Sequence, residues 1–376
     1  MKKVTLTFSI LAVMTAVTVA AARDTISVVG SSTVYPFATV VAERFGKTTD
    51  FNAPKVESTG SGGGLKLFCK GIGIDTPDVT NSSRRIKSSE FESCQANGVE
   101  DVIEVKVGFD GIVLANTKSS ALMELSRKDI YMALAKLVPG ADGKLIENPN
   151  QTWQDVNPEL PAIKIEVLGP PPTSGTRDAF AELALEGGAR QIDEIAKLRE
   201  LKADQLEEIT ALVKQLGIED AWAAAVKKKG AKAKGKDVVK IIGRSVREDG
   251  AYIEAGENDN LIIQKLVANP NAFGIFGYSF LDQNSDKVQG SIIDGQEPTF
   301  EAIAGGEYKV SRPLYFYVKK AHIGTIPGIK EYLEAFLSED AIGPDGYLID
   351  KGLIPLGDEQ YEEMSSSALD LTNLEM

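Results

Sequence analysis

The sequence predicts an α/β protein with doubly wound sheets, in which short strands alternate with amphipathic helices. Three times a strand-like run leads into a short loop of glycine and hydroxyl residues that opens a helix. These loops are Gly30–Thr33, Ser58–Gly64 and Thr173–Thr176. Strand, loop and helix in this order are typical of doubly wound domains, whose ligands bind at the carboxyl ends of the strands. Two such domains are expected. About 350 residues remain once the N-terminal signal pattern described below is left out, and this length exceeds what one hydrophobic core usually serves.

Hydrophobic spacing predicts the elements in chain order. The predicted strands cover 25–29, 102–107, 111–115 and 163–168. A helix that Pro36 can open is expected to end at Gly46, and a second helix, after the glycine-rich loop, at Gly71. The run 108–111 predicts a turn between two strands, since it holds two glycines. Two surface helices are predicted within 191–216, where apolar residues recur among many charges.

The first 22 residues have the pattern of a secretory signal peptide. Lys2 and Lys3 form a positive start, 6–19 an apolar stretch, and 20–22 a run of three alanines suited to cleavage. The apolar stretch is short for a membrane span, so a retained anchor is the less favoured alternative. We therefore expect residues 1–22 to be removed and the mature chain to lie in the periplasm.

The charge of the chain limits its partners. A formal net charge of −13 argues against nucleic acid, because binding to a phosphate backbone needs a basic face. A small anion stays compatible, since local N–H dipoles decide the potential inside a cleft. The lysine-rich run 227–236 is interpreted as a solvated loop, with anion steering or contact with acidic lipids as the alternative. No metal or cofactor is expected, because the single histidine, His322, has no companion ligands in sequence.

Cys69 and Cys94 are the only cysteines of the chain. In an oxidising compartment an isolated pair predicts a disulfide, which here closes a loop of roughly 25 residues and stabilises by about 3 kcal/mol. The loop contains the polar run 81–85, which the bridge would help to hold in place. Metal binding is the poorer interpretation, because no second cysteine pair exists.

Four segments together resemble a known family. They are GSSTVYPF at 30–37, TGSGGGL at 59–65, NSSRRI at 81–86 and TSGTRDAF at 173–180. Their types, order and spacing resemble the phosphate-contacting segments of periplasmic substrate-binding proteins of high-affinity phosphate ABC transporters. The resemblance extends to EAGENDNLI at 254–262 and to RPLYFYV at 312–318, which is similar to the family's return strand. It therefore covers essentially the whole mature chain.

The resemblance implies the type II periplasmic-binding-protein fold, with two doubly wound α/β lobes joined by a hinge. Lobe one would comprise 24–110 and 312–376, and lobe two 111–311. A monomer would hold inorganic phosphate in the cleft between the lobes and deliver it to an ABC transporter permease. Such a protein would be no enzyme and would need no cofactor.

The resemblance also implies the residues that bind phosphate. By position they are Ser32, Thr33, Val34, Ser61, Ser82 or Ser83, Ser174, Gly175 and Thr176. One branch of the family has an aspartate where this chain has Ser83, and an arginine where this chain has the proline run 170–172. We expect Arg84 and Arg177 to replace the missing charge, because guanidinium offers oxyanions a fork of donors. For the acceptor of the phosphate proton we expect Asp110, with Asp178 as the second choice.

Two alternative functions follow from the same loops. A sulfate or molybdate binder would use similar donors but would need no carboxylate acceptor, since sulfate has no proton to offer. A secreted phosphatase would need a base for a serine nucleophile, and the sole histidine stands in no partner motif. The carboxylate therefore discriminates between the oxyanions, and the missing base disfavours catalysis.

Overall fold

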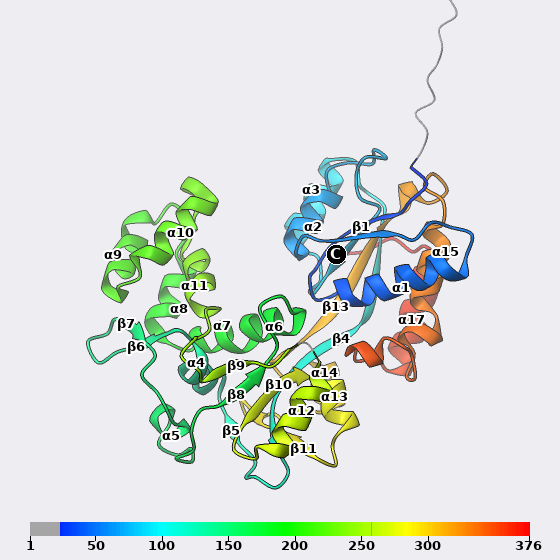
Figure 1. Cartoon of the computed structure of the whole chain (residues 1–376). Coiled ribbons are helices and arrows are strands. Elements are labelled where there is room, and N and C mark those ends of the chain that lie inside the picture. The colour runs from blue at the N-terminus through cyan, green and yellow to red at the C-terminus, as the bar shows by residue number, and fades with distance from the viewer. Residues whose placement is uncertain (1–22, 257) are drawn as a thin grey trace, which may run out of the picture.

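The computed structural model describes residues 23–256 and 258–376, which form two α/β lobes built on one shared sheet (Figure 1). The signal peptide predicted over 1–22 lies outside the described residues. The first elements are β1 (Ser27–Gly30), α1 (Tyr35–Thr48), β2 (Lys55–Ser58), α2 (Ser61–Phe68), β3 (Val79–Ser82), α3 (Ser88–Ala96) and β4 (Val102–Thr117). They make up most of the lobe that is blue and cyan in Figure 1.

The middle of the chain forms most of the other lobe and is rich in helices. Its first elements are β5 (Glu124–Leu125), α4 (Arg127–Leu134), β6 (Leu137–Pro139), β7 (Leu145–Glu147), α5 (Trp153–Val156), β8 (Val167–Gly169), α6 (Gly175–Phe180), the π-helix η1 (Ala181–Leu185) and α7 (Glu186–Ala189). Next come α8 (Asp193–Glu200), α9 (Leu206–Leu216), α10 (Glu219–Lys229), the 3-10 helix η2 (Gly230–Lys232) and α11 (Gly235–Gly243).

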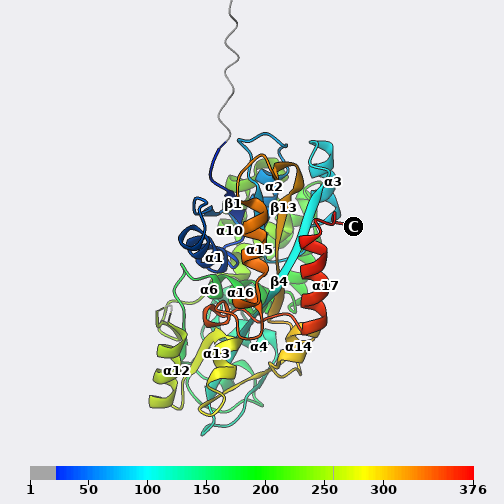
Figure 2. The same ribbon diagram turned by 90° about the vertical axis from the view of Figure 1, so that its right-hand side faces the viewer.

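The last third of the chain completes both lobes. It contains β9 (Tyr252–Glu254), α12 (Asp259–Ala268), β10 (Phe273–Gly277), α13 (Tyr278–Gln283), β11 (Val288–Gly290), β12 (Ile292–Ile293) and α14 (Phe300–Gly305). It continues with β13 (Ser311–Lys319), η3 (Lys320–His322), α15 (Ile329–Leu337), α16 (Glu339–Ile342), η4 (Ile349–Lys351) and α17 (Asp358–Leu369). Helix α17 lies beside the long strand β4, as Figure 2 shows, and α15 packs on β13 through Phe336 and Phe316.

Two long strands, β4 and β13, connect the lobes. The strand order is β2-β1-β3-β13-β4-β10-β8-β9, and β11 also pairs with β4. Strand β4 pairs antiparallel with β13 over 102–111 and then with β10 over 112–115. Strands β1, β2 and β3 are parallel to one another, as are β8, β9 and β10. Each lobe thus has parallel strands at its outer edge, and the predicted two-lobed α/β fold class is confirmed.

The turn predicted at 108–111 is wrong, because β4 runs through it without a break. Gly108 has φ +144°, and a Cβ there would lie 2.4 Å from the Ile354 carbonyl oxygen. The pairing with β13 shifts between Leu314 and Tyr315, opposite this glycine. The glycine therefore permits a β-bulge that bends the strand instead of ending it.

Other boundaries also differ from the prediction. Helix α1 continues past Gly46 to Thr48, because a single glycine near a helix end costs only about 1 kcal/mol. The lysine-rich run is not a simple loop: Lys227, Lys228 and Lys229 form the last turn of α10, where lysine complements the helix dipole. The two helices predicted within 191–216 are confirmed as α8 and α9, and their apolar faces join the core of their lobe. Within residues 23–256 and 258–376, no helix has the length and apolar character of a membrane span.

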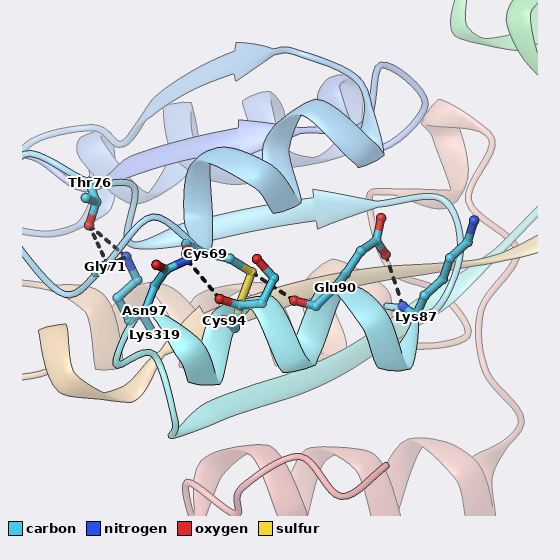
Figure 3. Close-up of a disulfide and its surroundings, with 9 residues drawn as sticks. Cys69, Gly71, Thr76, Lys87, Glu90, Cys94, Asn97 and Lys319 are labelled. Carbon is cyan, nitrogen blue, oxygen red and sulfur yellow. Dashed lines mark hydrogen bonds between the residues drawn. A yellow bond between two sulfur atoms is a disulfide. The ribbon is translucent and has the colours of Figure 1, made fainter. Parts of the chain in front are cut away.

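The predicted disulfide between Cys69 and Cys94 is confirmed (Figure 3). Cys69 caps the end of α2, and Cys94 lies in α3 with its side chain buried. Asn97 adds a second link, because its side-chain amide donates to the Cys69 carbonyl oxygen at 2.9 Å. The bridge therefore joins the helix that follows the glycine-rich loop to the helix that follows the serine-arginine segment.

Candidate functional site

The first and third predicted loops meet in a cleft between the lobes, and the second loop reaches its lining through Ser58 alone. The cleft has a volume of about 1010 Å³. Six of the predicted binding residues line it, namely Ser32, Thr33, Asp110, Ser174, Gly175 and Thr176. The starts of α1, α12 and α13 and the turn at 350–352 complete the lining. The cleft is therefore walled by segments from distant parts of the sequence.

The first and third loops touch each other directly. A Cβ on Gly175 would lie 3.2 Å from the Ser32 carbonyl oxygen and 3.4 Å from the Thr33 Cα. The Ser32 hydroxyl donates to the Asp178 carboxylate at 3.3 Å, which adds a polar contact across the cleft. Glycine at position 175 is what permits this close approach of the two backbones. Asp178, the second-choice acceptor, is thus already partnered by a serine.

The first loop satisfies part of its own hydrogen-bonding capacity. The Ser31 hydroxyl accepts from the backbone N–H groups of Thr33 at 3.2 Å and Val34 at 3.4 Å. Val34 is fully buried and does not line the cleft. The predicted donor at Val34 is therefore directed at Ser31, whereas the side chains of Ser32 and Thr33 reach the cleft.

The second loop is tied to the first but does not bring its predicted serine into the cleft. Thr59 donates its N–H to the Gly30 carbonyl oxygen at 2.9 Å. The Ser61 hydroxyl accepts from the Ser83 N–H at 3.0 Å, and the two hydroxyls are 3.2 Å apart. The Ser82 side chain is fully buried and donates to the Arg84 carbonyl oxygen at 2.6 Å. Ser61, Ser82 and Ser83 thus form a group next to the cleft, outside its lining.

The two arginines predicted to supply charge have other partners. Arg84 forms a bidentate pair with Glu90, with N–O distances of 2.8 and 2.7 Å. This bond to Glu90 raises the pKa of Arg84. The Arg177 guanidinium stacks over the Tyr252 ring at 4.0 Å, and its buried Nη1 has no hydrogen-bond partner. Neither arginine lines the cleft.

Two cations not selected from the sequence lie at the cleft: Lys351 is part of its lining, and Arg312 contacts the lining residues Thr33 and Asp110. Arg312 Nη2 donates to the Thr33 hydroxyl at 2.5 Å, and Nη1 lies 3.3 Å from Glu182 Oε2. Its Nε lies 3.4 Å from Asp110 Oδ2, close enough for an ion pair but not aligned as a hydrogen bond. In the β4–β13 register Arg312 stands directly opposite Asp110. The pairing of β4 with β13 brings these two residues together, and residue spacing along one strand does not reveal that pairing.

Burial dominates the electrostatics around Arg312. Asp110 is only 7% exposed, and burial raises its pKa against the opposing attraction of Arg312. For Glu182 burial also acts upward, but Arg244 and Arg312 outweigh it and lower the pKa. Glu182 lies in the π-helix η1, a type of helix turn often found at functional sites. The result is a buried charge cluster in which one Asp110 oxygen has no hydrogen-bond partner.

A second carboxylate, also not selected from the sequence, reaches the same cleft. Asp259 begins α12 and is 8% exposed, and its Oδ2 accepts from the Gly277 N–H at 3.2 Å. Burial, against the bond from Gly277 and with a further contribution from the nearby Asp110, raises the pKa of Asp259 to about 6. The segment EAGENDNLI at 254–262, noted for its resemblance to the family, contains Asp259 and could have pointed to it. Residue 257 of this segment lies outside the described residues.

The described part of the chain contains no candidate metal site, because no group of three or more His, Cys, Asp and Glu side chains there could hold an ion. His322 is buried away from the cleft lining. Its Nδ1 lies 2.6 Å from Asp78 Oδ1 and its Nε2 2.9 Å from the Ile72 carbonyl oxygen. These contacts tie His322 to the segment around Asp78, away from the cleft.

Known proteins are similar to this chain over most of its length. The family model described as "PBP superfamily domain" matches residues 15–340. A phosphate-binding protein PstS of Staphylococcus saprophyticus is 25% identical over 351 residues, which cover 91% of this chain and 83% of the relative. Protein SphX of Synechococcus elongatus is 26% identical, over 81% of this chain and 72% of its own length. A solved "possible phosphate binding protein" from Planctomyces limnophilus is 25% identical with a TM-score of 0.66, covering 93% of this chain and 99% of the other. The chain therefore belongs to the PBP superfamily.

Proposed function

We propose that this protein binds inorganic phosphate in the cleft and delivers it to the permease of an ABC transporter. One observation carries the proposal: two hydroxyl-rich loops from opposite lobes touch at Gly175, with the buried pair Arg312 and Asp110 beside them. The names of the relatives from Staphylococcus and Planctomyces support phosphate as the ligand.

The chemistry of the cleft suits a small tetrahedral anion. Hydroxyls of Ser32, Thr33, Ser174 and Thr176 can donate to oxyanion oxygens without adding charge. Arg312 supplies a cation, and its planar fork suits phosphate oxygens. Asp110 supplies an acceptor for the P–OH proton, because one of its oxygens has no hydrogen-bond partner. Sulfate has no proton for that oxygen and would meet only repulsion, so phosphate is favoured over sulfate.

The lobes and their hinge follow from the same proposal. Lobe one would comprise 24–110 and 312–376, and lobe two 111–311. The shared strands support this division, since β4 changes its partner from β13 to β10 after Gly111 and β13 starts at Ser311. Bending of β4 and β13 would then move one lobe against the other around the bound anion.

The remaining parts of the proposal concern the cell. A signal peptide over 1–22 would export the protein to the periplasm, where the disulfide Cys69–Cys94 can persist. The protein would act as a monomer that carries phosphate to the permease, without catalysing a reaction. A nucleic acid partner is disfavoured by the net charge of −13.

The test is a calorimetric titration of phosphate-stripped protein with phosphate, arsenate, sulfate and molybdate. We expect one phosphate per chain, similar binding of arsenate, and much weaker binding of sulfate and molybdate. Equal affinity for sulfate and phosphate would contradict phosphate selectivity. Preference for molybdate or sulfate would assign the cleft to that oxyanion instead.

A further inference from the structure

The start of helix α12 brings a second carboxylate to the proposed phosphate cleft. Asn258, Asp259 and Asn260 all line the cleft. The helix has 10 residues and begins at this point, with the Asn258 side chain accepting from the Leu261 N–H at 3.2 Å. The capping role thus belongs to Asn258, and Asp259 is not needed for it.

The Asp259 carboxylate is held in place but only partly satisfied. Its Oδ2 accepts from the Gly277 N–H at 3.2 Å, and among the described residues its Oδ1 has no hydrogen-bond partner and no ion pair. The side chain is more than nine-tenths buried. Because Asp259 lines the cleft, a ligand that brings a proton to this oxygen would gain a charge-assisted hydrogen bond.

Asp110 and Asp259 lie in the same cleft and repel each other. Each has one oxygen without a hydrogen-bond partner among the described residues. The other charged groups around them are Arg312 from β13, Asp350 and Lys351 from η4, and Asp178 from α6. Within the described part of the chain, only Arg312 pairs with either carboxylate, through Asp110. The two carboxylates are therefore an unusual pair of acceptors in a site built for an anion.

We propose, on the basis of the proposed function, that Asp259 is a second specificity-determining carboxylate and that Asp110 and Asp259 hold two protons in common with the bound phosphate. One proton lies in a hydrogen bond between phosphate and Asp110, and the other between phosphate and Asp259. The number of protons and the total charge are the same in two descriptions of this site: dihydrogen phosphate with two carboxylates, or hydrogen phosphate with one carboxylate and one carboxylic acid. Sulfate would have to acquire both protons from solution.

Two shared protons would link phosphate binding to proton uptake. At about pH 8 free phosphate carries mainly one proton, so a site that holds two protons takes up about one further proton when both carboxylates are ionised in the empty protein. The raised pKa of Asp259 agrees with easy protonation at this position. A cleft with a single acceptor would take up none at this pH.

The experiment is calorimetric titration of the mature protein with phosphate at about pH 8, in buffers of different ionisation enthalpy. The wild type is expected to take up about one proton per phosphate. Asp259→Asn is expected to take up none, to bind phosphate at least tenfold more weakly, and to lose most of the preference over sulfate. Asp286→Asn is the matched control, since it removes an exposed carboxylate that lies outside the cleft lining and is expected to retain the uptake.

Each result decides the proposal. The proposal is overturned if Asp259→Asn takes up as many protons per phosphate as the wild type and keeps the wild-type selectivity. If thermal unfolding shows that Asp259→Asn does not fold, Asp110→Asn replaces it and is expected to abolish the uptake in the same way. A wild type that binds no phosphate would overturn the proposed function itself, which separates the two failures.

Discussion

At the scale of single residues, the cleft depends on a buried arginine with three partners. Arg312 contacts Thr33 in the first loop, Asp110 in β4 and Glu182 in η1. Breaking a buried charge pair costs more than the pair contributes on its own, because the remaining charge is left without a counter-ion in a medium of low dielectric constant. Arg312 therefore determines both the charge of the cleft and the position of the Thr33 hydroxyl.

Replacing Arg312 tests its proposed role. Arg312→Ala is expected to lower phosphate affinity by tenfold or more, because truncating one partner of a buried charged bond costs on the order of 2 to 5 kcal/mol. Arg312→Lys should lose less phosphate affinity, since lysine keeps the positive charge but lacks the planar fork of donors. Titration with phosphate gives the affinities. Arg85→Ala serves as the control, because Arg85 is half-exposed and pairs with Glu104 away from the cleft. Wild-type affinity in Arg312→Ala would rule out a role in binding.

Asp259 should also affect how stability depends on pH. Its pKa is about 6 in the folded protein and near 3.8 when unfolded. The native state then binds more protons between these values, so the contribution of Asp259 to stability falls as pH rises from about 4 to about 6. The loss is on the order of 3 kcal/mol. Urea unfolding of ligand-free wild type and Asp259→Asn should therefore show the variant gaining relative stability over this range. A constant difference between them would refute the raised pKa.

At the scale of elements, the short loops hold their positions because the helices that follow them are packed or cross-linked within their lobes. Helix α6 continues without interruption into η1 and α7, which pack on α4 in the core of their lobe. Helices α2 and α3 are joined by the disulfide, and Glu90 in α3 holds Arg84. The loops thus have little freedom, which lowers the entropy cost of ordering them around a ligand.

Gly175 tests the contact between the two loops. Alanine at this position would place a methyl group 3.2 Å from the Ser32 carbonyl oxygen, so the loops must move apart by a few tenths of an ångström. We expect Gly175→Ala to lower phosphate affinity several-fold while changing the unfolding temperature little. Gly357→Ala is a suitable control, because a Cβ there meets no atom within 4 Å and the residue has φ −67°. Equal phosphate affinity in the two variants would contradict the importance of the contact.

Removing the disulfide should lower stability. In the chain-entropy model a bridge across 25 residues contributes about 3 kcal/mol. Urea unfolding with and without reductant is expected to differ by about this amount for the wild type. A protein with Cys69→Ser and Cys94→Ser should show the lower stability in both conditions, which controls for other effects of the reductant. If reduction leaves the wild type unchanged, the bridge does not stabilise the folded state.

At the scale of the whole molecule, the two lobes share β4 and β13, and the cleft lies where these strands pass between them. Residues from 32 to 352 contribute to its lining, so the complete site exists only when both lobes are folded and correctly placed. A ligand that contacts both lobes favours the native state over the unfolded chain, and binding is thereby linked to stability.

Phosphate should accordingly raise the unfolding temperature of the stripped protein. A ligand at a hundredfold excess over its Kd adds about 2.7 kcal/mol of stability. Thermal unfolding followed by circular dichroism is expected to shift upward with phosphate and much less with sulfate at the same ionic strength. Chloride at matched ionic strength controls for general salt effects. Equal shifts with all three anions would show that the effect is not specific.

The sequence by itself determined the features that depend on short stretches of chain. Glycine and hydroxyl residues between a strand and a helix identified the loops, of which two meet in the cleft, and the two cysteines identified the disulfide. The motifs, taken together, identified the family. These features were predictable because backbone conformation and helix starts follow from neighbouring residues.

Only the tertiary structure decided which charged side chains reach the cleft. Arg312 faces Asp110 because of the β4–β13 register across some 200 residues, while Arg84 is held by Glu90 and Arg177 stacks on Tyr252. Asp259 joins the cleft because α12 begins where β10 ends in space. Such contacts depend on strand register and packing between distant segments, and the periodicity of one segment carries no information about its partner. The chain's local pattern therefore specified the loops, and folding alone selected the charges that complete the site.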